Sequence, residues 1–146
     1  MGSRFAGAGG EGRAWAGAVA PDLAEFERLA ALAFAELPQE ILDLCGDIEI
    51  RVADFADDDA LDAVGVEDAF ELMGLFEGIG LAQGGAEAFS GRMPNRVWLY
   101  RRAILDYWCA YEEPLGAIIS HVLIHEIGHH FGLSDDDMDA IEAAAD

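Results

Sequence analysis

All four histidines of the chain lie within ten residues, in the segment HVLIHEIGHHFGLSDDD from His121 to Asp137. Pro114 suits the first turn of a helix, and the apolar positions after it continue a helix as far as Gly132. Glycine readily adopts the left-handed conformation that ends a helix. The segment therefore predicts one long helix that carries the histidines and stops at a sharp turn.

Two of these histidines have the spacing of metal ligands. His125 and His129 are four residues apart, so their imidazoles project from one face of a helix, about 6 Å apart, and can reach one ion. Glu126 is displaced around the helix, where it is poorly placed as a ligand but well placed to accept a proton from water activated by the metal. This is the H-E-x-x-H arrangement of zinc metalloproteases. We therefore predict Zn²⁺ as the cofactor and Glu126 as the catalytic general base.

The residues after the helix supply a third ligand. Gly132 turns the chain, so that Asp135 can double back and offer a carboxylate oxygen. Chance would produce H-E-x-x-H followed by such a glycine, and by an acid or a histidine three residues later, in roughly a few such chains in ten thousand. Glu142 is an alternative ligand, but a second helix would bring it to the metal only by folding fully back, so we predict Asp135. Three protein ligands leave the fourth position of a catalytic zinc open.

The charge of the chain limits its partners. Eight basic residues, all of them arginine, stand against 29 acidic residues and give a formal net charge of −21. Phosphate backbones repel such a chain, so we expect no nucleic-acid partner. No apolar run reaches the roughly 18 residues of a transmembrane helix, so we expect no membrane partner either.

The 146 residues suffice for one domain with a single core. We predict this domain over residues 21–146, preceded by a flexible arm over residues 1–20. Glycine and alanine interrupt any strong apolar region in that arm, which disfavours a secretion signal. Cys45 and Cys109 have no partner at zinc-finger spacing, although one disulfide between them is compatible with the sequence. These features favour a cytoplasmic protein with reduced cysteines.

Hydrophobic periodicity predicts the remaining secondary structure. The expected elements are a helix over residues 21–38, a strand over 47–55, a solvated loop at 57–59, a short helix over 66–76, a short strand at 79–81 inside a glycine-rich connection, a strand over 95–102, and helices over 103–113 and 136–145.

Over roughly residues 21–145 the sequence resembles the minimal-zincin family of small bacterial zinc metallopeptidases. The stretches that carry the resemblance include IEIRVADF, ELMGLFEG, MPNRVWLYRRAILDYW and HEIGHHFGLSDDDMDAIE. The family pattern H-E-x-x-H-x-x-G-x-x-D is matched without departure. The resemblance implies a compact single domain of the α/β (α+β) class, with a small mixed sheet packed on helices that include the H-E-x-x-H helix. It also implies a metallopeptidase that acts on a peptide or protein substrate.

Several side chains near the motif have more than one interpretation. The candidates to stabilise a developing oxyanion are Tyr100, Tyr107, Tyr111 and His121. His121 is alternatively a partner of a metal ligand or a partly buried side chain. His130 points away from the metal ligands on the helix, so we expect a structural role for it.

Two features around residue 97 also bear on substrate binding. Four arginines at positions 92, 96, 101 and 102 form either a basic lip for an acidic substrate or, as we prefer, salt bridges to an acidic body. The strand over residues 97–101 is a candidate to pair with an extended substrate.

Three function classes fit the sequence, and a zinc-dependent peptidase is favoured. The first alternative is a non-catalytic zinc-stabilised scaffold or regulator, but a structural zinc site normally fills all four positions and has no need of Glu126. The second is a zinc endoribonuclease, because His121, His125 and His129 form an H-x-x-x-H-x-x-x-H ladder. An acidic residue at position 135 and the net charge of −21 argue against the nuclease.

Overall fold

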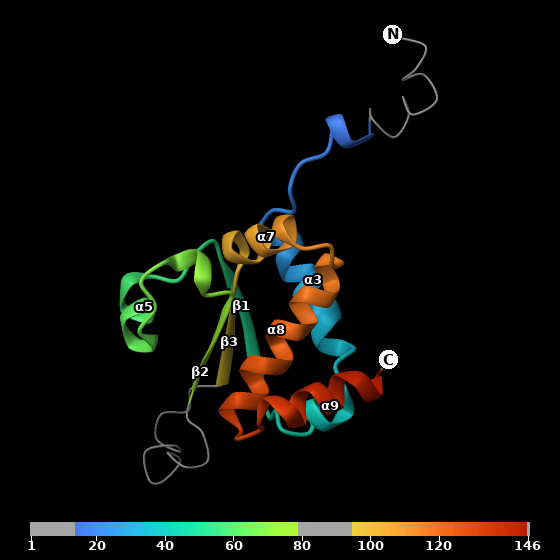
Figure 1. Ribbon diagram of the computed structural model, residues 1–146, viewed down its shortest axis with the longest axis vertical. Coiled ribbons are helices and arrows are strands. Elements are labelled where there is room, and N and C mark those ends of the chain that lie inside the picture. The colour runs from blue at the N-terminus through green and yellow to red at the C-terminus, as the bar shows by residue number, and fades with distance from the viewer. Residues whose placement is uncertain (1–13, 79–94, 146) are drawn as a thin grey trace.

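The computed structural model describes residues 14–78 and 95–145. The named elements in chain order are α3 (Leu23–Ala35), α4 (Gln39–Leu42), β1 (Ile48–Ala53), α5 (Asp58–Val64), the 3-10 helix η1 (Ala69–Glu71), β2 (Gly74–Glu77), β3 (Asn95–Tyr100), α7 (Arg101–Ala110), α8 (Leu115–His130) and α9 (Asp135–Ala145). They form a small mixed sheet packed between helices (Figure 1). The α+β class expected from the sequence is confirmed.

The sheet has the strand order β1-β3-β2. β1 runs parallel to β3, with Ile48 opposite Asn95, and β2 runs antiparallel to β3, with Gly74 opposite Leu99. The predicted strands at 47–55 and 95–102 are therefore present. Because β3 is paired on both sides, it cannot pair with a substrate strand as the sequence suggested. That role is open only to an edge strand.

Alternation along β3 separates two hydrophobic clusters. Val97 and Leu99 are fully buried in the main core beneath α3 and α8, together with Phe26 and Leu123. Tyr100 belongs to a smaller cluster on the other face, where α5 lies in Figure 1. Burial of each large side chain in the main core contributes about 1.5–3 kcal/mol to folding. The main core thus fixes α8 against the sheet.

The end of α8 is a glycine-terminated turn, as predicted. Gly132 has φ +88°, in the left-handed region. The backbone N–H of Leu133 donates to the carbonyl of Gly128 at 2.8 Å, and the N–H of Gly132 donates to the carbonyl of His129 at 3.1 Å. These two bonds form a Schellman motif, which closes the last turn of the helix.

The predicted final helix is present as α9, which packs against α8. Ser134 precedes it, and its hydroxyl accepts from the N–H of Asp137 at 3.0 Å while the carboxylate of Asp137 accepts from the N–H of Ser134 at 3.1 Å. This reciprocal pair is a capping box. Met138 is fully buried, and a Cβ on Gly128 would clash with its side chain. The absence of a side chain at Gly128 therefore lets the two helices approach closely.

Two local predictions are wrong. The helix expected over residues 66–76 is replaced by η1 and by β2, whose Gly74 lies so close to α8 that a Cβ there would meet Val122 and Glu126. Pairing with β3 and this close contact override the local helical preference. The loop expected at residues 57–59 instead begins α5, because the Asp57 carboxylate accepts from the N–H of Ala60 at 2.8 Å as a helix cap.

Other expectations have different outcomes. The strand expected at 79–81 lies outside the described residues. The arm expected over residues 1–20 is described only from residue 14, and residues 14–16 form a helical turn. Cys45 and Cys109 are both free thiols. Among the described helices, none is long and apolar enough to cross a bilayer.

Candidate metal centre

The structure brings together the three side chains that the sequence predicts as metal ligands. His125 and His129 come from the last two turns of α8, and their ring centroids are 5.9 Å apart. Asp135, the first residue of α9, places its Oδ1 3.0 Å from Nε2 of His129 and 4.0 Å from Nδ1 of His125. One ligand atom from each residue lies within 4.8 Å of the others, so the group has the dimensions to hold one ion.

Glu126 lies beside this group but faces β2. Its Cγ lies 3.3 Å from the place where a Cβ on Gly74 would be. Burial raises the pKa of the Glu126 carboxyl, whereas the nearby His129 and a hydrogen bond from the backbone N–H of Phe76 lower it. The glycine in β2 thus lets a half-buried carboxylate sit between the sheet edge and the candidate metal ligands.

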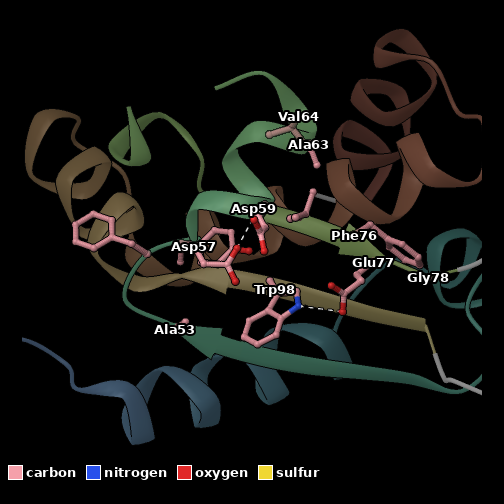
Figure 2. Close-up of a pocket in the computed structure, with 13 residues that line it drawn as sticks. Ala53, Asp57, Asp59, Ala63, Val64, Phe76, Glu77, Gly78 and Trp98 are labelled. Atoms are coloured by element: carbon pink, nitrogen blue, oxygen red, sulfur yellow. Dashed lines mark hydrogen bonds between the residues drawn. The ribbon is translucent and has the colours of Figure 1, made fainter. Parts of the chain in front are cut away.

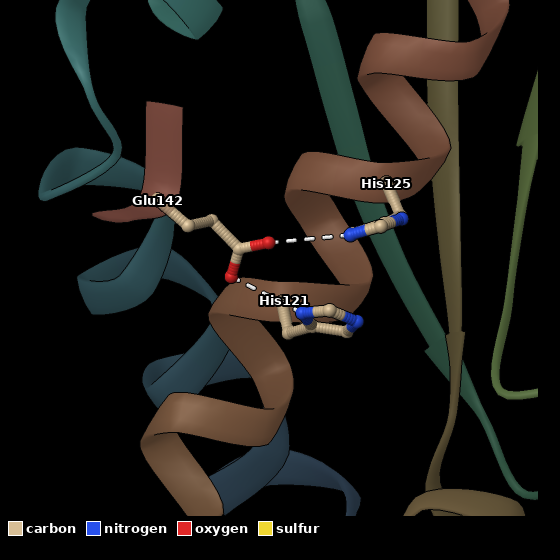
Figure 3. Close-up of side chains that lie close together, drawn as sticks. All are labelled: His121, His125 and Glu142. Carbon is tan, nitrogen blue, oxygen red and sulfur yellow. Dashed lines mark hydrogen bonds and ion pairs between the residues drawn. The ribbon is translucent and has the colours of Figure 1, made fainter. Parts of the chain in front are cut away.

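Glu142, which the sequence left as an alternative ligand, also comes close to a histidine of the motif. α9 does fold back along α8, and Oε1 of Glu142 lies 3.2 Å from Nε2 of His125. Its Oε2 lies 3.1 Å from Nδ1 of His121 (Figure 3). The sequence carried a signal for this contact, because Glu142 follows Asp135 by seven residues, two helical turns, and so shares its face of α9. The sequence left open whether His121 is a partner of a metal ligand or a partly buried side chain. In the structure it is exposed and contacts the candidate ligand His125 and the carboxylate of Glu142.

A comparison of sequences decides the family. The sequence model of the zincin-like metallopeptidase family matches residues 45–145, well over half of the chain. The chain belongs to the zincin-like metallopeptidase family. No curated protein matches it. The resemblance noted from the sequence is confirmed.

Membership in the zincin-like metallopeptidase family implies a metal, typically zinc. The donor set fits this implication, because imidazole nitrogens and a carboxylate oxygen are ordinary zinc ligands. Three protein ligands are also the number found in catalytic zinc sites, where water or substrate takes the fourth position. The described residues contain a second group of this kind, formed by His121, His125 and Glu142.

His130 has the structural role predicted for it in this zincin-like domain. Its ring stacks on Phe76 of β2, with centroids 3.8 Å apart and an interplanar angle of 17°. Burial lowers its pKa, and its Nε2 is buried without a hydrogen-bond partner among the described residues. The stack joins the end of α8 to the edge strand.

The candidate oxyanion groups lie in different surroundings. Tyr107 of α7 contacts Tyr111, which follows that helix, and the Tyr107 hydroxyl donates to Glu113 at 3.1 Å. Tyr100 is buried, and desolvation followed by the charges of Asp57, Glu77 and Glu126 raises its pKa to about 12. Among these three tyrosines, Tyr100 alone is buried, and Glu126 contributes the least of these groups to its raised pKa.

A groove of about 640 Å³ lies between α5 and the sheet (Figure 2). Trp98 lies on the sheet side of this groove, and its Nε1 donates to Glu77 at 3.4 Å. Asp57 and Asp59 line the groove from the α5 side. The sequence did not predict this groove, because its walls come from segments that meet only in the folded sheet.

The preferred interpretation of the four arginines is confirmed for Arg96 and Arg101, whereas the Arg102 guanidinium lies over the ring of Phe55, 5.4 Å from its centroid. Arg96 contacts Glu49 at 3.1 Å and Glu77 at 3.0 Å. Arg101 contacts Asp54 at 2.9 Å. Arg92 lies outside the described residues. The paired arginines therefore hold the sheet and its flanking turns together.

Proposed function

We propose that this protein is a zinc-dependent peptidase that hydrolyses peptide bonds, with His125, His129 and Asp135 as metal ligands and Glu126 as general base. The observation that carries the proposal is the convergence of the three candidate ligands beside a half-buried carboxylate at the end of α8. Neither a structural zinc site nor a packing contact needs that carboxylate.

The chemistry follows from the places of these side chains. Zinc, when bound, lowers the pKa of a coordinated water to about 7 and polarises a substrate carbonyl. Glu126 accepts a proton as water adds to the carbonyl carbon and forms the new carbon–oxygen bond. It then delivers this proton to the nitrogen of the departing amine, so the carbon–nitrogen bond breaks and the carbonyl re-forms. The N–H of Phe76, which donates to Glu126, orients this carboxylate.

The edge strand is the proposed place for the substrate backbone. β2 pairs with β3 on one side only within the described residues, and it packs against α8. An extended peptide added at its free side would lie next to Glu126, because Gly74 and Phe76 of β2 contact that residue. This strand replaces β3 as the candidate for strand addition.

The test is digestion of a peptide library by the zinc-loaded protein, with and without a chelator. We expect cleavage that the chelator abolishes and that added zinc restores. Glu126→Gln should retain zinc and lose at least about a hundredfold in activity. Asp136→Asn, which alters an exposed carboxylate outside both ligand groups, is the control and should cleave normally.

Other results would point to other functions. Undiminished cleavage by Glu126→Gln would remove Glu126 from the mechanism. Zinc binding without cleavage of any peptide would favour a zinc-stabilised scaffold or regulator. Cleavage of RNA at low salt would favour the nuclease, but we expect no binding of RNA to a chain of charge −21.

A further inference from the structure

We propose that His121, His125 and Glu142 form a second site for a divalent transition-metal ion, one helical turn along α8 from the proposed catalytic ligands. The inference rests on the proposed function only where it calls the group of His125, His129 and Asp135 catalytic. The second site itself is argued from its own geometry and is tested by metal binding alone.

The ligand atoms already have suitable separations. Metal–ligand bonds of about 2.0–2.1 Å in tetrahedral geometry place neighbouring ligand atoms about 3.3 Å apart. The two oxygens of Glu142 lie 3.1 Å from Nδ1 of His121 and 3.2 Å from Nε2 of His125. In the proposed catalytic group the corresponding distances from Asp135 are 3.0 and 4.0 Å. The second group is therefore at least as close to a coordinating arrangement as the first.

The side chains of the second site converge from two helices. His121 and His125 are four residues apart on α8, with ring centroids 4.0 Å apart, and Glu142 reaches across from α9 (Figure 3). Two imidazoles and one carboxylate match the ligand set of many catalytic zinc sites and suit other late first-row metals. Such a set is more selective than a cluster of carboxylates, which suits magnesium or calcium.

An ion can reach this site from solvent. A groove of about 400 Å³ is lined by His121 and Glu142, and Glu36 and Glu113 add two further carboxylates to its wall. The negative charge of these walls attracts a cation, and water in the groove can complete its coordination. Ser120, which also lines the groove, adds a neutral polar surface.

His125 belongs to both groups, and this makes them compete. Its Nε2 faces Glu142, whereas its Nδ1 is the nitrogen nearest Asp135. A neutral imidazole has one unprotonated nitrogen, so His125 can bind an ion in only one group at a time. We therefore infer that one ion has two alternative positions on this face of α8.

Only one of these positions suits catalysis. Glu126 faces β2, where its Cγ lies close to Gly74, whereas Glu142 approaches His121 and His125 from α9. An ion held by His121 and Glu142 would thus be bound away from the proposed base. The second site would hold the metal in an unproductive position.

The decisive experiment measures the binding of Co²⁺ and Zn²⁺ to the full chain by equilibrium dialysis, with Co²⁺ absorption spectra to report coordination. His129→Ala disables the first group, and we expect it to retain one ion per chain. In that background Glu142→Ala should lower affinity by at least about a hundredfold. Asp135→Ala in the same background removes the other carboxylate and should change affinity less than about threefold.

Further variants complete the design. His121→Ala alone should still bind one ion through the first group, whereas the double variant His121→Ala/His129→Ala should bind none. Asp139→Ala, an exposed acid one turn before Glu142, is the charge control in each background. Circular dichroism checks that every variant is folded.

Two results would overturn the second site. One is complete loss of metal from folded His129→Ala, which would mean that Glu142 only orients His125. The other is retained binding in His129→Ala that neither His121→Ala nor Glu142→Ala weakens. Neither outcome depends on peptide cleavage, so the second site can fail while the proposed peptidase stands, and the reverse also holds.

Discussion

Asp135 and Glu142 lie two turns apart on one helix, yet different features hold them in place. Asp135 is 73% exposed, and the Gly132 turn and the Ser134 cap determine where it lies. Glu142 is 27% exposed and lies in the middle of α9, where packing of the helix against α8 sets its position. A ligand beside a turn is thus placed by local backbone geometry, and a ligand inside a helix by tertiary contacts.

Both carboxylates depend on the packing of α9 against α8, so loss of that packing should have the largest effect on stability and metal affinity. Met138→Ala deletes a fully buried side chain that packs on Gly128, and we expect a loss of about 2–5 kcal/mol in the free energy of unfolding. Metal affinity should fall at both groups, because α9 carries both carboxylates. Denaturant titration and Co²⁺ binding measure the two effects. Met138→Leu should cost less than about 1.5 kcal/mol, and an equal cost for both variants would contradict this account.

The next largest effect is a difference in peptide hydrolysis between variants of Asp135 and of Glu142. Asp135→Ala should reduce peptide hydrolysis by at least about a hundredfold, equivalent to about 2.7 kcal/mol, while an ion stays bound through Glu142. Glu142→Ala should change hydrolysis by less than about tenfold at saturating zinc. Initial rates and bound zinc are measured on the same samples. A tenfold to hundredfold loss in Glu142→Ala would instead indicate a carboxylate that orients a ligand histidine.

A smaller effect is expected at the turn. Gly132→Ala places a side chain at φ +88°, which costs about 1–2 kcal/mol in the free energy of unfolding. Affinity of the Asp135 group should fall more than that of the Glu142 group. Gly116→Ala is the matched control, because Gly116 is a helical glycine with open space around it and the change should stabilise by up to about 1 kcal/mol. Effects of the same sign at both glycines would argue against strain at Gly132.

The smallest effect concerns the cap of α9. Ser134→Ala removes the hydroxyl that accepts from the N–H of Asp137, and we expect a loss of about 1 kcal/mol in the free energy of unfolding. Ser134→Thr keeps the acceptor and should lose much less. Thermal unfolding distinguishes the two variants, and identical melting temperatures would show that the cap contributes nothing.

The same contrast explains what the sequence could predict. α8, its end at Gly132 and the approach of Asp135 depend on spacing within about twenty residues, so periodicity and one glycine were enough. The approach of Glu142 to His125, which the sequence left only as an alternative, depends on a missing side chain at Gly128 and on Met138, a contact between two helices. No local sequence pattern predicts that α9 packs back along α8.

β2 was missed for a related reason. Residues 66–76 have the apolar content of a short helix, but Gly74 accommodates α8 and residues 74–77 pair with β3. Both α8 and β3 are distant from β2 in sequence. Their contacts with β2 contribute more to its conformation than the small local preference of these residues for a helix. The groove beside Trp98 was beyond prediction because the sequence did not predict α5, whose first residues were expected to form a loop.

The topology of the sheet has a consequence for the order of folding. β1 and β3 pair across 47 residues, whereas only residues 131–134 separate α8 from α9. Loop closure costs more entropy as the intervening chain lengthens, so the α8–α9 hairpin is expected to form before the parallel pair. The three histidines and two carboxylates would then come together early in folding. The contacts of Glu126 with β2 would form later, when β2 pairs with β3. A full-length chain that refolds in this order would bring its candidate metal ligands together before it has an edge strand on which to bind a substrate.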